Sequence, residues 1–138
     1  MSDHKYVAFD VHKSTITAVV LNLEGKMVTQ AVIETDANCV RDFLRGLSGE
    51  VHLTFEEGTH AQWLYELTRR LVSHLTVCNA RRLNSKGNNS DRIDALKLAQ
   101  LLRAGLLPFH RTTACTGARK ARFVWFHELP RAPGDAKR

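Results

Sequence analysis

The first quarter of the chain consists of three short runs of hydrophobic and β-branched residues. These runs cover residues 5–11, 14–23 and 26–34, and their composition predicts three strands. Between the second and third runs, residues 23–26 read Leu-Glu-Gly-Lys, a tight turn in which Gly25 can adopt a positive φ. Because short links join the three runs, we expect them to form an antiparallel meander.

Beyond residue 35 the hydrophobic spacing becomes helical in three places. Asp36 is placed to cap a first helix that stops by Gly49, and Thr59 to cap a second helix that carries Trp63 into the core. A third helix is predicted over residues 91–104, because apolar residues recur there every three or four positions before Gly105.

Two further strands alternate with these helices, at residues 50–55 and 75–78. Three antiparallel strands followed by strand–helix alternation predict an α/β domain with a mixed sheet and helices on its faces. We expect this domain to cover residues 1–107. Residues 108–138 lack a clear period and contain Pro130 and Pro133, so we expect a basic tail that is poorly ordered or a non-native continuation.

Length and composition narrow the class of protein. The 138 residues and 43% hydrophobic content suit one domain with its own core. No apolar run approaches the roughly 20 residues that span a bilayer, and no export signal opens the chain. Three cysteines without CxxC spacing fit the cytoplasm better than a disulfide framework. The net charge of +6 divides into +1 over residues 1–107 and +5 over residues 108–138, so the domain itself carries almost no excess charge.

Five acidic residues stand out by their positions. Asp10 interrupts an apolar strand, Glu56 and Glu57 directly follow another strand, and Asp91 and Asp94 lie three apart at the start of a helix. Each position also has an ordinary structural explanation. Turn amides can satisfy Asp10, the two glutamates can decorate an exposed turn, and the two aspartates can compensate the helix dipole.

The combination is more informative than any one of these residues. If the first and fourth strands are parallel neighbours, Asp10 and Glu56 approach each other at one edge of the sheet. Several carboxylates in one place repel each other unless cations compensate them, and Mg²⁺ or Mn²⁺ prefers such oxygen ligands. Two such ions can activate a nucleophile and stabilise the leaving oxygen during phosphodiester cleavage.

Three motifs carry a resemblance to a known family. They read Ala-Phe-Asp-Val-His-Lys at residues 8–13, Thr-Phe-Glu-Glu-Gly-Thr at 54–59 and Asn-Asn-Ser-Asp-Arg-Ile-Asp-Ala at 88–95. With the order of elements, they resemble the N-terminal domain of the DEDD transposases of the insertion-sequence-110 family, relatives of the Piv invertase. The resemblance implies a ribonuclease H-like fold in its RuvC-like, Holliday-junction-resolvase form.

The resemblance also implies a set of functional residues. The catalytic, metal-binding tetrad of the family falls on Asp10, Glu56, Asp91 and Asp94, with Glu57 as the alternative to Glu56. It further implies a divalent metal, normally Mg²⁺, and transposition or site-specific recombination of DNA. A structured guide RNA that bridges two DNAs and assembly as a homo-oligomer are implied as well.

Basic residues near the acidic positions predict contact with nucleic acid. Lys13 follows Asp10 closely, and Arg81, Arg82, Lys86 and Arg92 surround the segment before the helical aspartates. Beside an anionic cleft such side chains would contact backbone phosphates, although charge runs of this kind are often no more than a solvated loop.

We therefore expect the catalytic domain of a metal-dependent DNA transposase. We also expect it to lack the serine-bearing second domain of the family that it resembles, and so not to be competent for recombination alone. The alternative is a nucleic-acid-binding or assembly module without turnover. A third class, the actin-like ATPases and sugar kinases, is disfavoured because the turn after Asp10 lacks the glycines of a phosphate loop.

Overall fold

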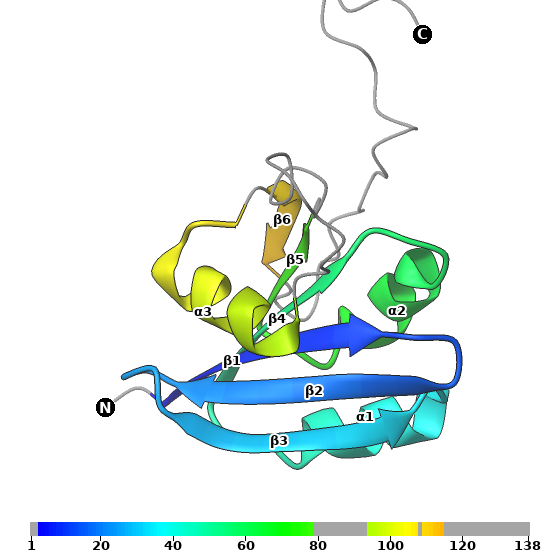
Figure 1. Cartoon of the computed structure of the whole chain (residues 1–138), viewed down its shortest axis with the longest axis horizontal. Helices are drawn as coiled ribbons and strands as arrows, with labels where there is room; N and C mark the ends of the chain where they lie inside the picture. Colours follow the sequence, from blue (N-terminus) through cyan, green and yellow to red (C-terminus); the bar gives the residue numbers. More distant parts are fainter. Residues whose placement is uncertain (1–2, 79–93, 108, 115–138) are drawn as a thin grey trace, which may run out of the picture.

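A computed structural model describes residues 3–78, 94–107 and 109–114 of the chain (Figure 1). The described elements alternate after an initial meander of strands, as the sequence predicts. In chain order they are β1 (His4–Val11), β2 (Thr15–Asn22), β3 (Met27–Glu34), α1 (Ala37–Arg45), β4 (Glu50–Glu56), α2 (Ala61–Thr68), β5 (His74–Cys78), α3 (Ala95–Ala104) and β6 (Phe109–Ala114).

All six strands belong to one mixed sheet in the order β3-β2-β1-β4-β5-β6. The first three strands pair antiparallel, and the turn between β2 and β3 places Gly25 at a φ of 90°, as predicted. β1, β4 and β5 are parallel neighbours, which the intervening helical segments allow. The expected α/β fold class, three antiparallel strands followed by strand–helix alternation in a ribonuclease H-like arrangement, is confirmed.

Two hydrophobic layers sandwich the sheet. On one face, alternate residues of the strands such as Val7, Phe9 and Phe55 form a core with α1 and α2. On the other face, Ala8 and its neighbours on β2 pack against α3. Alternation along each strand therefore divides the side chains between the two helical layers, and residues 8 and 10 point toward the α3 side.

The first helix begins as predicted, and the second differs. Asp36 caps α1 by accepting hydrogen bonds from the amides of Asn38 and Cys39. The predicted cap of α2 by Thr59 is wrong, because the cap position is His60, which makes no side-chain capping bond. The chain instead enters α2 through a turn in which the amide of Ala61 donates to the carbonyl of Gly58 at 3.1 Å.

The core role predicted for Trp63 is also wrong. The buried face of α2 consists of residues 61, 64, 65 and 68, which follow helical spacing. Trp63 lies off this stripe and is 37% exposed. Size and hydrophobicity favoured it for the core, whereas its phase on the helix places it at the surface.

One more strand is described beyond residue 107, and the sequence does not predict it. Phe109–Ala114 forms β6, which pairs antiparallel with β5 and closes one edge of the sheet. An edge strand needs only one neighbour for its backbone hydrogen bonds, so it requires little hydrophobic periodicity of its own.

The described part of the third helix begins at Ala95 with Asp94 as its cap, four residues later than predicted.

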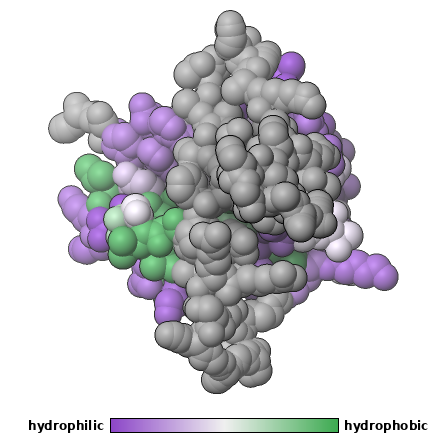
Figure 2. All heavy atoms as spheres, turned by 90° about the horizontal axis from the view of Figure 1, so that it is seen from above, coloured by the Kyte–Doolittle hydropathy of each residue, from purple (hydrophilic) through white to green (hydrophobic). Residues whose placement is uncertain are grey.

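The surface seen from above the orientation of Figure 1 is mixed (Figure 2). Hydrophobic atoms gather on one side of this view, next to hydrophilic ones. Large apolar side chains that are exposed in the described residues include Val28 and Val32 of the β3 edge strand and Leu106 after α3. None of the described helices is long and apolar enough to cross a membrane.

Candidate metal centre at the carboxyl ends of the parallel strands

Asp10 and Glu56 lie side by side where β1 and β4 end. The parallel register pairs Phe9 with Phe55, and the next residue of each strand is the acidic one. Neighbouring strands lie about 4.8 Å apart, and residues in register on parallel strands point to the same face. Both carboxylates therefore start from adjacent positions on the α3 side of the sheet, as the sequence predicts for parallel neighbours.

A histidine contacts the first of these carboxylates. His12 Nε2 lies 3.3 Å from Asp10 Oδ2, and the Asp10 side chain is only 16% exposed. A backbone hydrogen bond holds the turn that carries His12, because the amide of His12 donates to the carbonyl of Thr15 at 2.8 Å. The half-buried Asp10 carboxylate is therefore oriented by His12 from the short turn between β1 and β2.

A buried thiol lies beside the glutamates at the same end of the sheet. Cys78 ends β5 in register with Glu56 and is fully buried. Burial, together with the charges of Glu56 and Glu57, raises the pKa of the Cys78 thiol to about 12.

α3 directs its N-terminus toward this end of the sheet. Arg103, in its last turn, donates through Nη1 to the carbonyl of Leu23 at 2.9 Å, beside the point where Asn22 pairs with Lys5 at the start of β1. α3 therefore runs antiparallel to β1, as Figure 1 also shows. Its ten residues extend about 15 Å, close to the roughly 17 Å that separate Lys5 from Asp10 along the strand.

Asp94 consequently starts α3 at the end of the sheet where Asp10 lies. Its Oδ1 accepts a hydrogen bond from the amide of Lys97 at 2.9 Å, so the side chain caps the helix. The side chains of Asp10, Glu56 and Asp94 do not form a group of ligand atoms within 4.8 Å of one another among the described residues. The fold thus brings three of the predicted acids to one end of the sheet without closing them into a ligand set.

Glu57 occupies a different position from Glu56. Its amide donates to the carbonyl of Cys78 at 2.9 Å, just beyond the last residue of β4. A small cavity of about 60 Å³ opens here, lined by Val11, both glutamates, residues 58–61 and Leu64. By register, Glu56 rather than Glu57 is the neighbour of Asp10.

The remaining predicted site residues divide into two groups. Lys13 is exposed in the turn after β1, close in sequence to Asp10. Asp91, Arg81, Arg82, Lys86 and Arg92 lie outside the described residues.

A second group of chemically active side chains was not predicted from the sequence. His4, Glu50, His52 and His74 gather at the amino ends of β1, β4 and β5, opposite the acidic end. Glu50 and His52 are two positions apart, but His4 lies 46 positions before Glu50 and His74 lies 22 positions after His52, so the four give no recognisable motif. The signal that could have revealed them is the parallel register itself, which aligns His4 with Glu50 and His52 with His74.

Comparison with known proteins adds two findings. A family model for DEDD transposases of the IS110 type, described as a transposase family, matches residues 7–116. A transposase for insertion sequence element IS1533 from Leptospira borgpetersenii is 29% identical over 106 residues. The aligned region covers 72% of this chain and 31% of that relative, so the chain spans about a third of the relative's length.

Proposed function

Because the chain belongs to the DEDD transposase family of the IS110 type, we propose that it is a metal-dependent catalytic domain that acts on DNA phosphodiester bonds. The observation that supports this most is the parallel register of β1 and β4, which sets Asp10 beside Glu56 on the α3 face. Ligands of α/β sheets bind beyond the carboxyl ends of such strands, where these two carboxylates lie.

The residues fit a hard divalent cation. We infer that Asp10, Glu56, Asp91 and Asp94 hold Mg²⁺ or Mn²⁺, because carboxylate oxygens are the ligands these ions prefer. The ions, when bound, would polarise the scissile phosphate and lower the pKa of an attacking hydroxyl or water. The half-buried Asp10, fixed by the β1–β2 turn and by His12, would orient the ligand set.

Basic residues would supply the contacts to nucleic acid. Lys13, Arg81, Arg82, Lys86 and Arg92 would bind backbone phosphates, which position a duplex without reading its sequence. A structured guide RNA and homo-oligomeric assembly, both implied by the family resemblance, belong to the same proposal. Complete recombination would require chain beyond this domain, since the relative is about three times as long as the aligned region.

The proposal is tested first by metal binding. We expect the 138-residue chain to bind Mn²⁺ in a titration followed by electron paramagnetic resonance. Asp10→Asn should lose most of this binding, whereas Asp42→Asn, the same change at an exposed position of α1, should retain it. Equal Mn²⁺ affinity in Asp10→Asn and the parent chain would contradict the proposed site.

Turnover is tested separately, with branched and supercoiled DNA as substrates. Divalent-dependent cleavage that disappears in Asp10→Asn supports a catalytic domain. DNA binding without cleavage, unchanged by Asp10→Asn, supports the alternative of a nucleic-acid-binding or assembly module. Glu56→Gln and Glu57→Gln then decide which glutamate matters, and by register we expect the larger loss with Glu56→Gln.

A further inference from the structure

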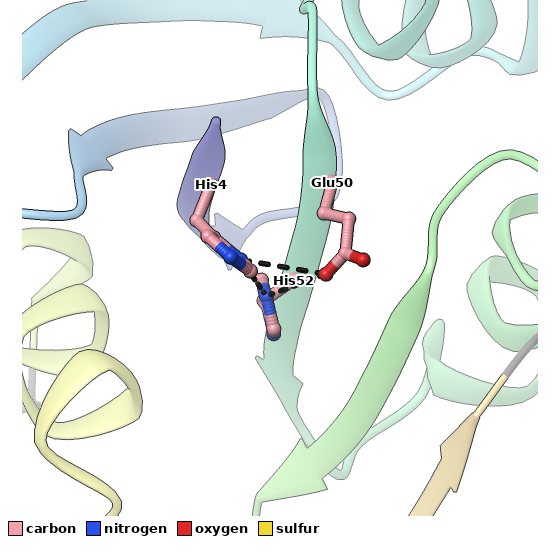
Figure 3. Close-up of side chains that lie close together, drawn as sticks. All are labelled: His4, Glu50 and His52. Atoms are coloured by element: carbon pink, nitrogen blue, oxygen red, sulfur yellow. Dashed lines mark hydrogen bonds and ion pairs between the residues drawn. The ribbon is translucent and has the colours of Figure 1, made fainter. Parts of the chain in front are cut away.

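Three side chains from two strands converge at the end of the sheet opposite the acidic residues (Figure 3). His4 Nδ1 lies 3.1 Å from His52 Nε2 and 3.4 Å from Glu50 Oε1. His52 Nε2 lies 3.9 Å from the same oxygen of Glu50. Two imidazole nitrogens and one carboxylate oxygen therefore point at one small region of space.

The sheet holds these groups in place. His4 stands in register with Glu50 on the neighbouring parallel strand, and His52 stands beside Tyr6. The Tyr6 and His52 rings stack with centroids 4.6 Å apart, and His74 stacks on the other side of His52 at the same distance. The ring of His52 is thus fixed between aromatic rings from both adjacent strands.

The three separations match those expected around a single metal ion. A circle through the three ligand atoms has a radius of about 2.0 Å, and zinc lies about 2.0–2.2 Å from histidine nitrogen and carboxylate oxygen. We propose that His4, Glu50 and His52 form a binding site for a divalent transition-metal ion of the Zn²⁺ class. The site does not depend on the function proposed above.

The chemistry of the ligands selects the class of ion. Imidazole nitrogen favours Zn²⁺, Co²⁺ and similar ions, while Mg²⁺ prefers oxygen ligands and retains its waters. Three protein ligands leave a fourth position open, and Glu50 is 53% exposed, so water can complete the coordination. His74 Nε2 lies 4.0 Å from Glu50 Oε1 and flanks the site without belonging to the set of three.

Burial keeps one of the ligands in its metal-binding form. The pKa of His52 is lowered to about 4, first by burial and then by the neighbouring histidines His74 and His4. A neutral imidazole has a lone pair available for a metal, so His52 need not release a proton at neutral pH. This supports the geometric argument, which stands on the three distances alone.

The site is remote from the acidic end. Asp10 lies six positions after His4 along β1, which corresponds to about 20 Å of extended strand. An ion here would join the starts of β1 and β4, whose first residues, His4 and Glu50, are 46 positions apart along the chain. We therefore expect it to stabilise the sheet rather than to take part in phosphodiester chemistry.

Co²⁺ serves as a spectroscopic substitute for Zn²⁺ in the test. The intact chain is kept in Mg²⁺, so that this ion saturates the acidic end. It should then bind one Co²⁺ ion and show the visible absorption bands typical of Co²⁺ in a low-symmetry site. Added Zn²⁺ should displace the Co²⁺ and abolish these bands. Glu50→Gln and His52→Gln should each weaken Zn²⁺ binding by more than about 100-fold, beyond the effect of losing an outer-shell partner.

Matched controls make the outcome decisive. His60→Gln, at the start of α2 where the ring meets Trp63 edge-on, should leave Zn²⁺ affinity unchanged. Glu50 is exposed, so Glu50→Gln should fold normally even if a change at the partly buried His52 does not. The proposed site is wrong if Zn²⁺ binding to the parent chain does not saturate. It is also wrong if Glu50→Gln and the parent chain have the same Zn²⁺ affinity.

Discussion

The two ends of the parallel strands present opposite kinds of chemistry on the same face of the sheet. At the carboxyl ends, the carboxylates of Asp10 and Glu56 occupy adjacent positions in register. At the amino ends, His4 and His52 bring imidazole nitrogens to one carboxylate oxygen of Glu50. The parallel register of β1 and β4 brings together both the carboxylates at one end and the histidine cluster at the other.

The difference lies in the ligand atoms. An all-oxygen set suits hard ions such as Mg²⁺, whereas two imidazoles and a carboxylate suit Zn²⁺. Each end can therefore be disrupted without disturbing the other, because about 20 Å of strand separates them.

The largest expected effect is a reciprocal loss of metal affinity. Asp10→Asn should weaken Mn²⁺ binding by at least about 100-fold and leave Zn²⁺ binding within twofold, while His52→Gln should do the reverse. Isothermal titration of both ions into both variants measures the four affinities. If either substitution weakened both metals equally, the two ends would be coupled or one variant misfolded, which circular dichroism of each variant distinguishes.

The next effect is a loss of stability in acid that is specific to the histidine end. The pKa of His52 is lowered to about 4 from its usual 6.5 by burial, His74 and His4, with Glu50 opposing the shift. Between these two values the unfolded chain takes up a proton that the folded chain excludes. Stability therefore falls as the pH drops from about 6.5 to 4, by at most about 3 kcal/mol from this group.

Urea unfolding at pH 7 and pH 4.5, in a chelator so that no metal occupies the cluster, measures this loss. His52→Gln should remove part of the difference between the two pH values, and His60→Gln should not. An acid destabilisation identical in His52→Gln and the parent chain would show that other groups account for it.

The two ends also differ in how far the sequence reveals them. Asp10 interrupts an apolar strand and Glu56 ends another, so the pattern marks both without knowledge of contacts. His4 and His52 each look like ordinary alternating polar positions near a strand start. Only the register between strands far apart in sequence brings them together, and no local pattern encodes that register.

Helices show the same division between local and non-local information. The capping of α1 by Asp36 depends on neighbouring amides, so the sequence predicts it correctly. The exposure of Trp63 depends on which face of α2 meets the sheet, and the strand β6 depends on pairing with β5. The sequence predicts neither feature, because packing against distant elements decides both.

A smaller effect separates the two roles of Asp94. Asp94→Ala should remove the cap of α3 and cost about 1 kcal/mol of unfolding free energy, because the amide of Lys97 loses its acceptor. Asp36→Ala is the matched change at α1 and should cost a similar amount. Mn²⁺ affinity should fall in Asp94→Ala alone, and equal Mn²⁺ affinities in the two variants would leave Asp94 with a capping role only.

The smallest effect is expected midway between the two ends. Thr54 lies between His52 and Glu56 on the same face, fully buried, and its Oγ1 has no hydrogen-bond partner in the part of the chain that is described. Thr54→Val keeps the shape and removes a hydroxyl that is costly to desolvate, so stability should stay unchanged or rise by up to about 1 kcal/mol. Urea unfolding measures the change.

Thr68 provides the matched control for this change. It is also fully buried, but its Oγ1 donates to the carbonyl of Leu64 at 2.8 Å, so Thr68→Val should destabilise the protein by about 1 kcal/mol. Both metal affinities should be the same in Thr54→Val as in the parent chain, since neither ligand set includes the hydroxyl. Thr54→Val could instead destabilise the fold as much as Thr68→Val. The Thr54 hydroxyl would then have a hydrogen-bond partner outside the described residues, and the middle of β4 would contribute polar contacts of its own between the two metal sites.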